Sequence, residues 1–212
     1  MQSPSSTQPR RVPCQERGER RVAELIDAAE LVIAEAGYES ATMSAIAEHA
    51  GASIGSLYQF FPNKASITQA LRTEYGKQFD TMCAPLADQA GRLELKPFVG
   101  RLIDVTVRFV DTHPAFLALL DAPRSTRTLP EIRNHILERF AGFFLAQQPR
   151  ISKARAMRLA TITMQIVKAL NQIYSELPVD ERRPVVQEFK SVLYFYLQAR
   201  LGPSEGTRMG SQ

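Results

Sequence analysis

The sequence predicts an all-α protein in two parts, a small three-helix unit followed by a larger helical domain. Apolar residues recur at spacings of three and four along most of the chain, which is the period of amphipathic helices. The breaks between these stretches fall at glycine and proline, and no stretch shows the alternating pattern of a strand. At 212 residues, 44% of them hydrophobic, the chain is long enough to bury a substantial core.

The first two helices are predicted from apolar stripes and from the residues that end them. One stripe runs from Val22 to Ala36, and Gly37 follows it as the usual C-terminal glycine. Thr42 then has the side chain of an N-cap for a second helix that ends at Gly51. The residues expected to face inward are Val22, Leu25, Ile26, Ala29, Val32, Ile33 and Ala36 on the first helix, and Met43, Ile46, Ala47 and Ala50 on the second.

A third, short helix is predicted between its N-cap, Ser53, and Pro62. One side of this helix is apolar, and the other carries small, neutral, hydrogen-bonding residues. The first side holds Ile54, Leu57, Tyr58 and Phe61, and the second holds Gly55, Ser56 and Gln59. The second side suits close approach to base edges in a DNA major groove. Together the three helices form a helix-turn-helix unit of the homeodomain-like kind.

This pattern resembles the amino-terminal domain of the TetR (tetracycline repressor) family of transcriptional regulators. The resemblance covers residues 20–66 and rests on Thr42, Ile46, Ala47, Ala50, Gly51, Ser53, Gly55, Leu57, Tyr58, Phe61 and Lys64. It implies, by weaker analogy, a helical effector-binding and dimerisation domain over residues 67–201. Phe60 departs from the pattern, because many members carry histidine or tyrosine there and phenylalanine cannot donate a hydrogen bond to a phosphate.

Residues of this unit are expected to contact DNA in two ways. Backbone N–H groups near Thr42, the Lys64 ammonium and the Tyr58 hydroxyl suit phosphate oxygens. By resemblance to the family, Ser44, Ile54, Gly55, Ser56 and Gln59 face bases, and Ile54 packs on a thymine methyl group. Ser53, which caps the third helix, completes the predicted set.

The net charge of +4 is concentrated near the start of the chain, because residues 10–21 contain five arginines and two glutamates. Residues 1–19 are expected to form a flexible basic arm. Arg17 in this arm and Arg20, the first residue after it, are expected to contact the minor groove or phosphates. The alternative is that this segment is solvated and has no role in DNA binding. Because residues 42–63 contain no lysine or arginine, the other neutralising charges are expected from Lys64, Arg72 and Lys77.

The rest of the chain is expected to be helical as far as a flexible tail, residues 202–212. The expected helices span residues 64–82, ending near Pro85, then 95–112, 115–121, 129–146, 152–176 and 180–201. The last two are apolar on more than one face, which favours a four-helix homodimer interface, and the alternative is burial within one monomer. The predicted interface residues are Leu159, Ile162, Ile166, Leu170, Phe189, Val192, Leu193 and Tyr196.

The middle helices mix polar and apolar residues in a way that could line a cavity for an unidentified small-molecule effector. The candidate residues are Arg108, His113, Phe116, Met164, Lys168, Asn171 and Tyr174. The histidines lack metal-ligand spacing, and Cys14 and Cys83 are expected to be free thiols. No catalytic motif is present, so neither an enzyme nor a cofactor is predicted.

No apolar run is long enough to cross a membrane and no signal peptide is recognisable, so a cytoplasmic location is expected. The predicted function is a ligand-responsive repressor that binds a palindromic, double-stranded DNA operator as a homodimer. The alternatives are a constitutive helix-turn-helix protein without an effector and a helical carrier or enzyme.

Overall fold

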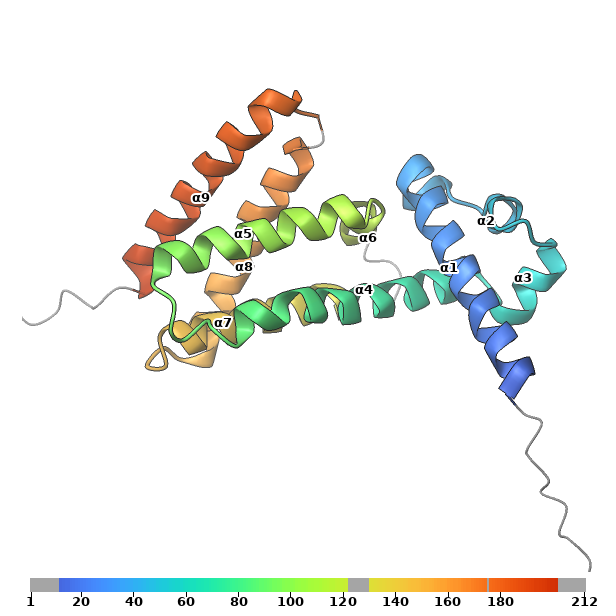
Figure 1. Ribbon diagram of the computed structural model, residues 1–212, viewed down its shortest axis with the longest axis horizontal. Helices are drawn as coiled ribbons and strands as arrows, with labels where there is room; N and C mark the ends of the chain where they lie inside the picture. The colour runs from blue at the N-terminus through green and yellow to red at the C-terminus, as the bar shows by residue number, and fades with distance from the viewer. Residues whose placement is uncertain (1–11, 122–129, 175, 202–212) are drawn as a thin grey trace, which may run out of the picture. The chain divides into compact units, whose positions relative to one another are not determined.

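The computed structural model describes residues 12–121, 130–174 and 176–201, and within these ranges it contains helices and turns but no strand (Figure 1). The predicted all-α fold is therefore confirmed. The chain divides into two compact units, residues 1–72 and residues 73–212, and the division falls within helix α4 (Lys64–Ala87), beyond the predicted limit at residue 66. Residues 1–11 of the expected arm and the expected tail, 202–212, lie outside the described residues.

The first unit contains α1 (Val12–Ser40), α2 (Met43–His49), α3 (Ile54–Phe60) and the first turns of α4. Because α1 begins at Val12, residues 12–19 of the expected flexible arm are helical. Adding residues to an existing helix costs little once its later turns are held by packing, so helix extends into this basic segment. Near the other end of α1, Gly37 has a φ of 77°, which glycine adopts readily, and interrupts the helix where the sequence predicts its end.

The caps and turn predicted for α2 and α3 are confirmed. Thr42 Oγ1 accepts a hydrogen bond from the backbone N–H of Ala45 at 3.1 Å, and Ser53 Oγ accepts one from Ser56 at 3.1 Å. Gly51, with a φ of 56°, ends the α2 turn in the left-handed region. Most of the residues predicted to face inward are buried, among them Leu25, Ala29, Val32, Ile33, Met43, Ile46 and Ala47, whereas Ala36 is exposed.

The second unit contains the rest of α4 followed by five helices in the described ranges: α5 (Leu95–Thr112), α6 (Phe116–Asp121), α7 (Pro130–Gln147), α8 (Lys153–Tyr174) and α9 (Val179–Leu201). Helix α8 packs against α5, α7 and α9, and α5 also packs against α9. Buried aromatic rings form much of this core. The Phe79 and Phe109 rings meet edge to face, with centroids 5.1 Å apart, and the centroids of the Phe79 and Phe140 rings are 6.2 Å apart.

Helix α4 is longer than predicted, because Pro85 lies inside it and the helix ends at Ala87. A proline has no N–H to donate to the carbonyl four residues earlier, so α4 loses one backbone hydrogen bond at Pro85 and ends two residues later. Side chains tie this helix to α7, since Asp80 accepts hydrogen bonds from Arg139 and lies 3.0 Å from Nε2 of His135.

In the parts of the chain that the structure describes, none of the helices combines the length and the apolar character that spanning a bilayer requires. The same ranges hold no cluster of three or more histidine, cysteine or carboxylate side chains placed to bind a metal ion.

Candidate nucleic-acid interface and ligand cavity

Helix α3 is held to the first unit by one side only. Leu57 is fully buried and Phe61, which follows the helix, is 7% exposed. The other two apolar residues of the predicted stripe face outward, since Ile54 is 41% and Tyr58 is 50% exposed. Gly55 and Gln59 are also exposed, and Ser56 is half-buried. The outer side of α3 therefore presents a small polar surface bordered by two exposed apolar residues.

The N-terminal ends of α2 and α3, at Thr42 and Ser53, are accessible. Both side chains are exposed, as is Ser44 in the first turn of α2. Each capping hydroxyl accepts a backbone N–H of its own helix, so its O–H hydrogen remains a donor for another group. This arrangement allows the same residue to orient its helix and to contact a phosphate.

Positive charge lies beside this surface on α1. Arg17 and Arg20 are exposed and three residues apart, so they lie on one side of the helix. Arg21 pairs with Glu24 at 2.7 Å and donates from Nη1 to the backbone oxygen of Ala50 at 3.4 Å. That contact places this part of α1 against the end of α2, close to the turn that precedes α3.

Lys64 is placed differently from the expectation of a cation directed to a phosphate. Its Nζ donates to the backbone oxygens of Tyr38 at 2.8 Å and Glu39 at 2.9 Å, and it lies 4.8 Å from the centre of the Tyr38 ring. These carbonyls lie in the single turn that follows the interruption at Gly37, and each accepts a charged hydrogen bond from the ammonium. Since an ammonium has three N–H donors, one remains for a further contact.

Two other features of this unit differ from the sequence-based expectations. Arg72 is 2% exposed, with its guanidinium carbon 5.8 Å from the Tyr38 ring centre, so it cannot supply charge to DNA as predicted. Asn63, which the sequence analysis missed, caps α4, because its Oδ1 accepts the N–H of Ser66 at 2.8 Å. An asparagine before a helix was the available signal.

Three of the eight residues predicted for the homodimer interface are buried within one copy. Leu159, Leu170 and Leu193 are at most 4% exposed, so they belong to the core of the second unit and have almost no surface to offer a second copy. The other five predicted residues, Ile162, Ile166, Phe189, Val192 and Tyr196, keep some exposed surface. Phe195, which the prediction omitted, is 65% exposed, and Val192 is 55% exposed.

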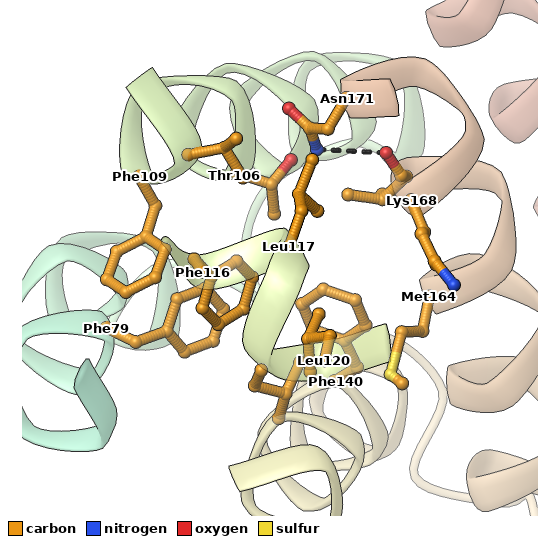
Figure 2. Close-up of a pocket in the computed structure, with 13 residues that line it drawn as sticks. Phe79, Thr106, Phe109, Phe116, Leu117, Leu120, Phe140, Met164, Lys168 and Asn171 are labelled. Carbon is orange, nitrogen blue, oxygen red and sulfur yellow. Dashed lines mark hydrogen bonds between the residues drawn. The ribbon is translucent and has the colours of Figure 1, made fainter. Parts of the chain in front are cut away.

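A small cavity lies among α4, α5, α6, α7 and α8 in the second unit (Figure 2). Its volume is about 30 Å³, which is enough to hold a water molecule. Four phenylalanines from four helices form its aromatic wall, and its polar residues come from α5 and α8. The phenylalanines are Phe79, Phe109, Phe116 and Phe140, and the polar residues are Thr106, Lys168 and Asn171.

Four of the seven candidate effector residues line this cavity: Phe116, Met164, Lys168 and Asn171. The other three do not. Arg108 is exposed on α5, and the His113 ring packs on Phe109 with centroids 4.4 Å apart. Tyr174 lies under the guanidinium of Arg182, 5.1 Å from its ring centre. Phe79, Phe109 and Phe140 were missed because helical periodicity marks them only as core residues.

Comparisons with known proteins identify both units. The family model described as "Bacterial regulatory proteins, tetR family" matches residues 25–71, and the one described as "Tetracyclin repressor-like, C-terminal domain" matches residues 94–197. A search of curated proteins gives no significant match.

Solved structures share the fold at low sequence identity. A TetR-like transcriptional regulator from Rhodococcus sp. RHA1 is 21% identical, with a TM-score of 0.65 over 93% of this chain and 100% of that chain. The transcriptional regulator FadR from Bacillus subtilis, in complex with stearoyl-CoA, is 22% identical, with a TM-score of 0.61 over 81% of this chain and 95% of that chain. The multidrug binding protein EbrR, complexed with imidazole, is 19% identical, with a TM-score of 0.63 over 89% of this chain and 98% of that chain.

Proposed function

This chain belongs to the TetR family of bacterial transcriptional regulators, and we propose that it is a ligand-responsive repressor that binds a palindromic operator as a homodimer. The observation that most supports DNA binding is the orientation of α3. Leu57 and Phe61 anchor this helix from one side, while Ile54, Gly55 and Gln59 are left exposed on it. A rigidly held helix with small and amide side chains outward can enter a major groove.

The contacts divide into those that position the protein and those that read bases. In the proposal, Thr42, Ser53 and Tyr58 bind phosphates through hydroxyl or nearby backbone N–H groups. Gln59 and Ser56 hydrogen-bond base edges, and Ile54 packs on a thymine methyl. Arg17 and Arg20 supply the long-range attraction, because residues 42–63 contain no lysine or arginine.

A homodimer is proposed because a single α3 covers only one half-site. Two copies related by a two-fold axis read half-sites about 34 to 36 Å apart, in successive major grooves. The exposed apolar residues of α8 and α9 support such an association, since Ile162 is 44%, Val192 is 55% and Phe195 is 65% exposed. Large apolar side chains that recur on adjacent helices favour burial against a second copy.

A ligand response is proposed from the cavity in the second unit. FadR and EbrR, which share this fold, are described with bound small molecules. Helix α4 begins at Lys64 in the unit that carries α3 and continues to Phe79, which lines the cavity. A ligand that displaces Phe79 would act on the same helix that leaves the DNA-binding unit, and a small change in half-site spacing would lower the affinity for DNA.

The test is selection of bound sequences from a random pool of duplex DNA with the purified chain at low salt. The proposal predicts enrichment of a palindrome whose half-sites lie about one helical turn apart. The matched control is Gln59→Ala with Ser56→Ala, a pair of truncations that leaves the buried side of α3 intact. Absence of enrichment by the wild-type chain would contradict the proposal.

A constitutive DNA-binding protein without an effector is the second candidate. It is favoured by the cavity volume of about 30 Å³, because ligand pockets usually measure about 300 to 1,000 Å³. A ligand that binds the folded state raises the melting temperature and, in the first candidate, releases DNA. A chemically broad ligand screen in which no compound changes either property would favour the second candidate.

A further inference from the structure

The cavity wall contains one buried acceptor without a donor. Asn171 is 3% exposed, and its Nδ2 donates to the backbone oxygen of Val167 at 2.9 Å, one helical turn earlier (Figure 2). That bond fixes which end of the amide is the nitrogen, and the Oδ1 at the other end has no hydrogen-bond donor among the described residues. Because a buried unsatisfied acceptor is costly, such groups in native proteins call for an explanation.

Two of the polar groups in the cavity wall are already committed as donors. The Thr106 hydroxyl donates to the backbone oxygen of Ile103 at 2.8 Å, so its hydrogen is already used. The amide nitrogen of Asn171 itself is committed to Val167. A hydroxyl on a molecule that enters the cavity would supply the missing hydrogen bond to Oδ1.

Part of the remaining wall is aromatic and suited to a further ring. The Phe109 and Phe116 rings meet edge to face with centroids 4.9 Å apart, and Phe79 packs edge to face on Phe109 at 5.1 Å. These rings offer both faces and edges, which are the two surfaces that a further ring contacts favourably.

The cavity must widen to admit even a single ring, which favours a small ligand over a large one. A cavity of about 150 Å³ in another protein binds benzene, so a single ring needs about five times the 30 Å³ seen here. Two parts of the wall can move and so widen the cavity. Met164 is a flexible side chain, and α6 is a helix of six residues that has little stability of its own. A long acyl chain would require a much larger rearrangement.

We propose that this cavity binds a phenol-type ligand, an aromatic ring whose hydroxyl donates a hydrogen bond to Asn171 Oδ1. This inference rests on the proposed ligand response and names the chemical class of the ligand. The ring packs among Phe79, Phe109 and Phe116, and the hydroxyl pairs the acceptor that the protein leaves open. An ionised carboxylate at the same position has only acceptor oxygens, so it would face the acceptor Asn171 Oδ1 without a hydrogen to share.

The test compares matched probes on the full chain by isothermal titration calorimetry: 4-propylphenol, its methyl ether, propylbenzene, benzoate and octanoate. The phenol is expected to bind about tenfold more tightly than the ether and propylbenzene, the value of one neutral hydrogen bond. Equal affinities for these three probes would overturn the proposal. So would tighter binding of benzoate or octanoate, or no binding by any probe.

Two variants of α8 separate recognition from stability. Asn171→Leu keeps the branched shape without the acceptor, and is expected to bind the phenol, its ether and propylbenzene with equal affinity. Thr163→Val removes another buried, unpartnered oxygen on the same helix, and Thr163 does not line the cavity. It is expected to keep the tenfold preference. Loss of the preference in Thr163→Val, or its retention in Asn171→Leu, would contradict the assignment.

The proposed function is measured separately, by fluorescence anisotropy of the same protein with its selected DNA. DNA release by the phenol is expected. Phenol binding with unchanged DNA affinity would contradict the ligand response while leaving the ligand class in place. DNA binding without binding of any probe would contradict the ligand class alone.

Discussion

The ammonium of Lys64 donates to the backbone oxygen of Tyr38 at 2.8 Å and lies 4.8 Å from the centre of the Tyr38 ring. One side chain at the start of α4 therefore binds both the backbone and the ring at the end of α1. The contact sets the position of the α4 N-terminus, and with it the segment that follows α3.

Lys64→Ala is expected to lower the free energy of unfolding by about 1 to 2 kcal/mol, because charged hydrogen bonds to two carbonyls and a cation–π contact are lost. Urea denaturation without DNA measures this. The matched control is Lys77→Ala, whose side chain is 70% exposed and pairs with Glu74 at 3.4 Å, and which should change stability little. Equal effects of the two substitutions would show that the Tyr38 contact contributes nothing.

Gln59→Ala is expected to relax base preference at one position of each half-site by about 1 to 3 kcal/mol, because the amide is exposed on the outer side of α3. Ser56→Ala should do the same at a neighbouring position. Anisotropy titrations with single-base variants of the selected site measure both effects. If Gln59→Ala weakens all sequences equally, this residue contacts the backbone and the base-reading assignment fails.

Arg17→Ala and Arg20→Ala are each expected to reduce the slope of log affinity against log salt by about 1 for every phosphate contact removed. Base preference should not change. Arg92→Ala is the control, since Arg92 is an exposed arginine of the second unit. An unchanged slope in both α1 variants would assign Arg17 and Arg20 to a solvated face without a role in binding.

Phe195→Glu is expected to convert the dimer into a monomer and to weaken operator binding, because a charge would be buried in the proposed contact between copies. Sedimentation equilibrium reports the mass and circular dichroism confirms the fold. Leu31→Glu, at a residue 44% exposed on α1, is the control and should leave the mass unchanged. A wild-type chain that sediments as a monomer would remove the basis of this prediction.

Cys83 is expected to resist alkylation in the folded protein. Burial raises the pKa of its thiol from 9.0 to about 12, so at pH 8 the thiolate that reacts with iodoacetamide is nearly absent. The measurement uses Cys14→Ser to leave a single cysteine. Mass spectrometry should detect no adduct at pH 8 without denaturant and a complete reaction in urea; rapid labelling of the folded chain would contradict the burial of Cys83.

The features that were predictable from sequence are local ones. Thr42 and Ser53 cap helices through N–H groups only three residues away, and Gly51 ends α2 through its own backbone conformation. Such signals need no knowledge of the rest of the chain. They were enough to place α2, the turn and α3 correctly.

The features that sequence alone did not reveal depend on distant partners. From the sequence, Arg72 is expected to be an exposed cation. In the structure it is buried beside Tyr38, which lies far away in the chain. On α8, Leu159 and Ile162 are equally apolar, but only Leu159 faces the core. Where a helix is apolar on several sides, periodicity cannot tell which side its own domain covers.

The most direct test of the account is whether DNA covers the outer side of α3. Gln59→Cys is prepared in the Cys14→Ser background, where Cys83 is buried and unreactive, and labelled with a maleimide with and without the selected DNA. Arg92→Cys is the control for an exposed position in the second unit. The account predicts strong protection of position 59 by DNA and none at position 92. Equal labelling of position 59 with and without saturating DNA would show that α3 does not enter the groove.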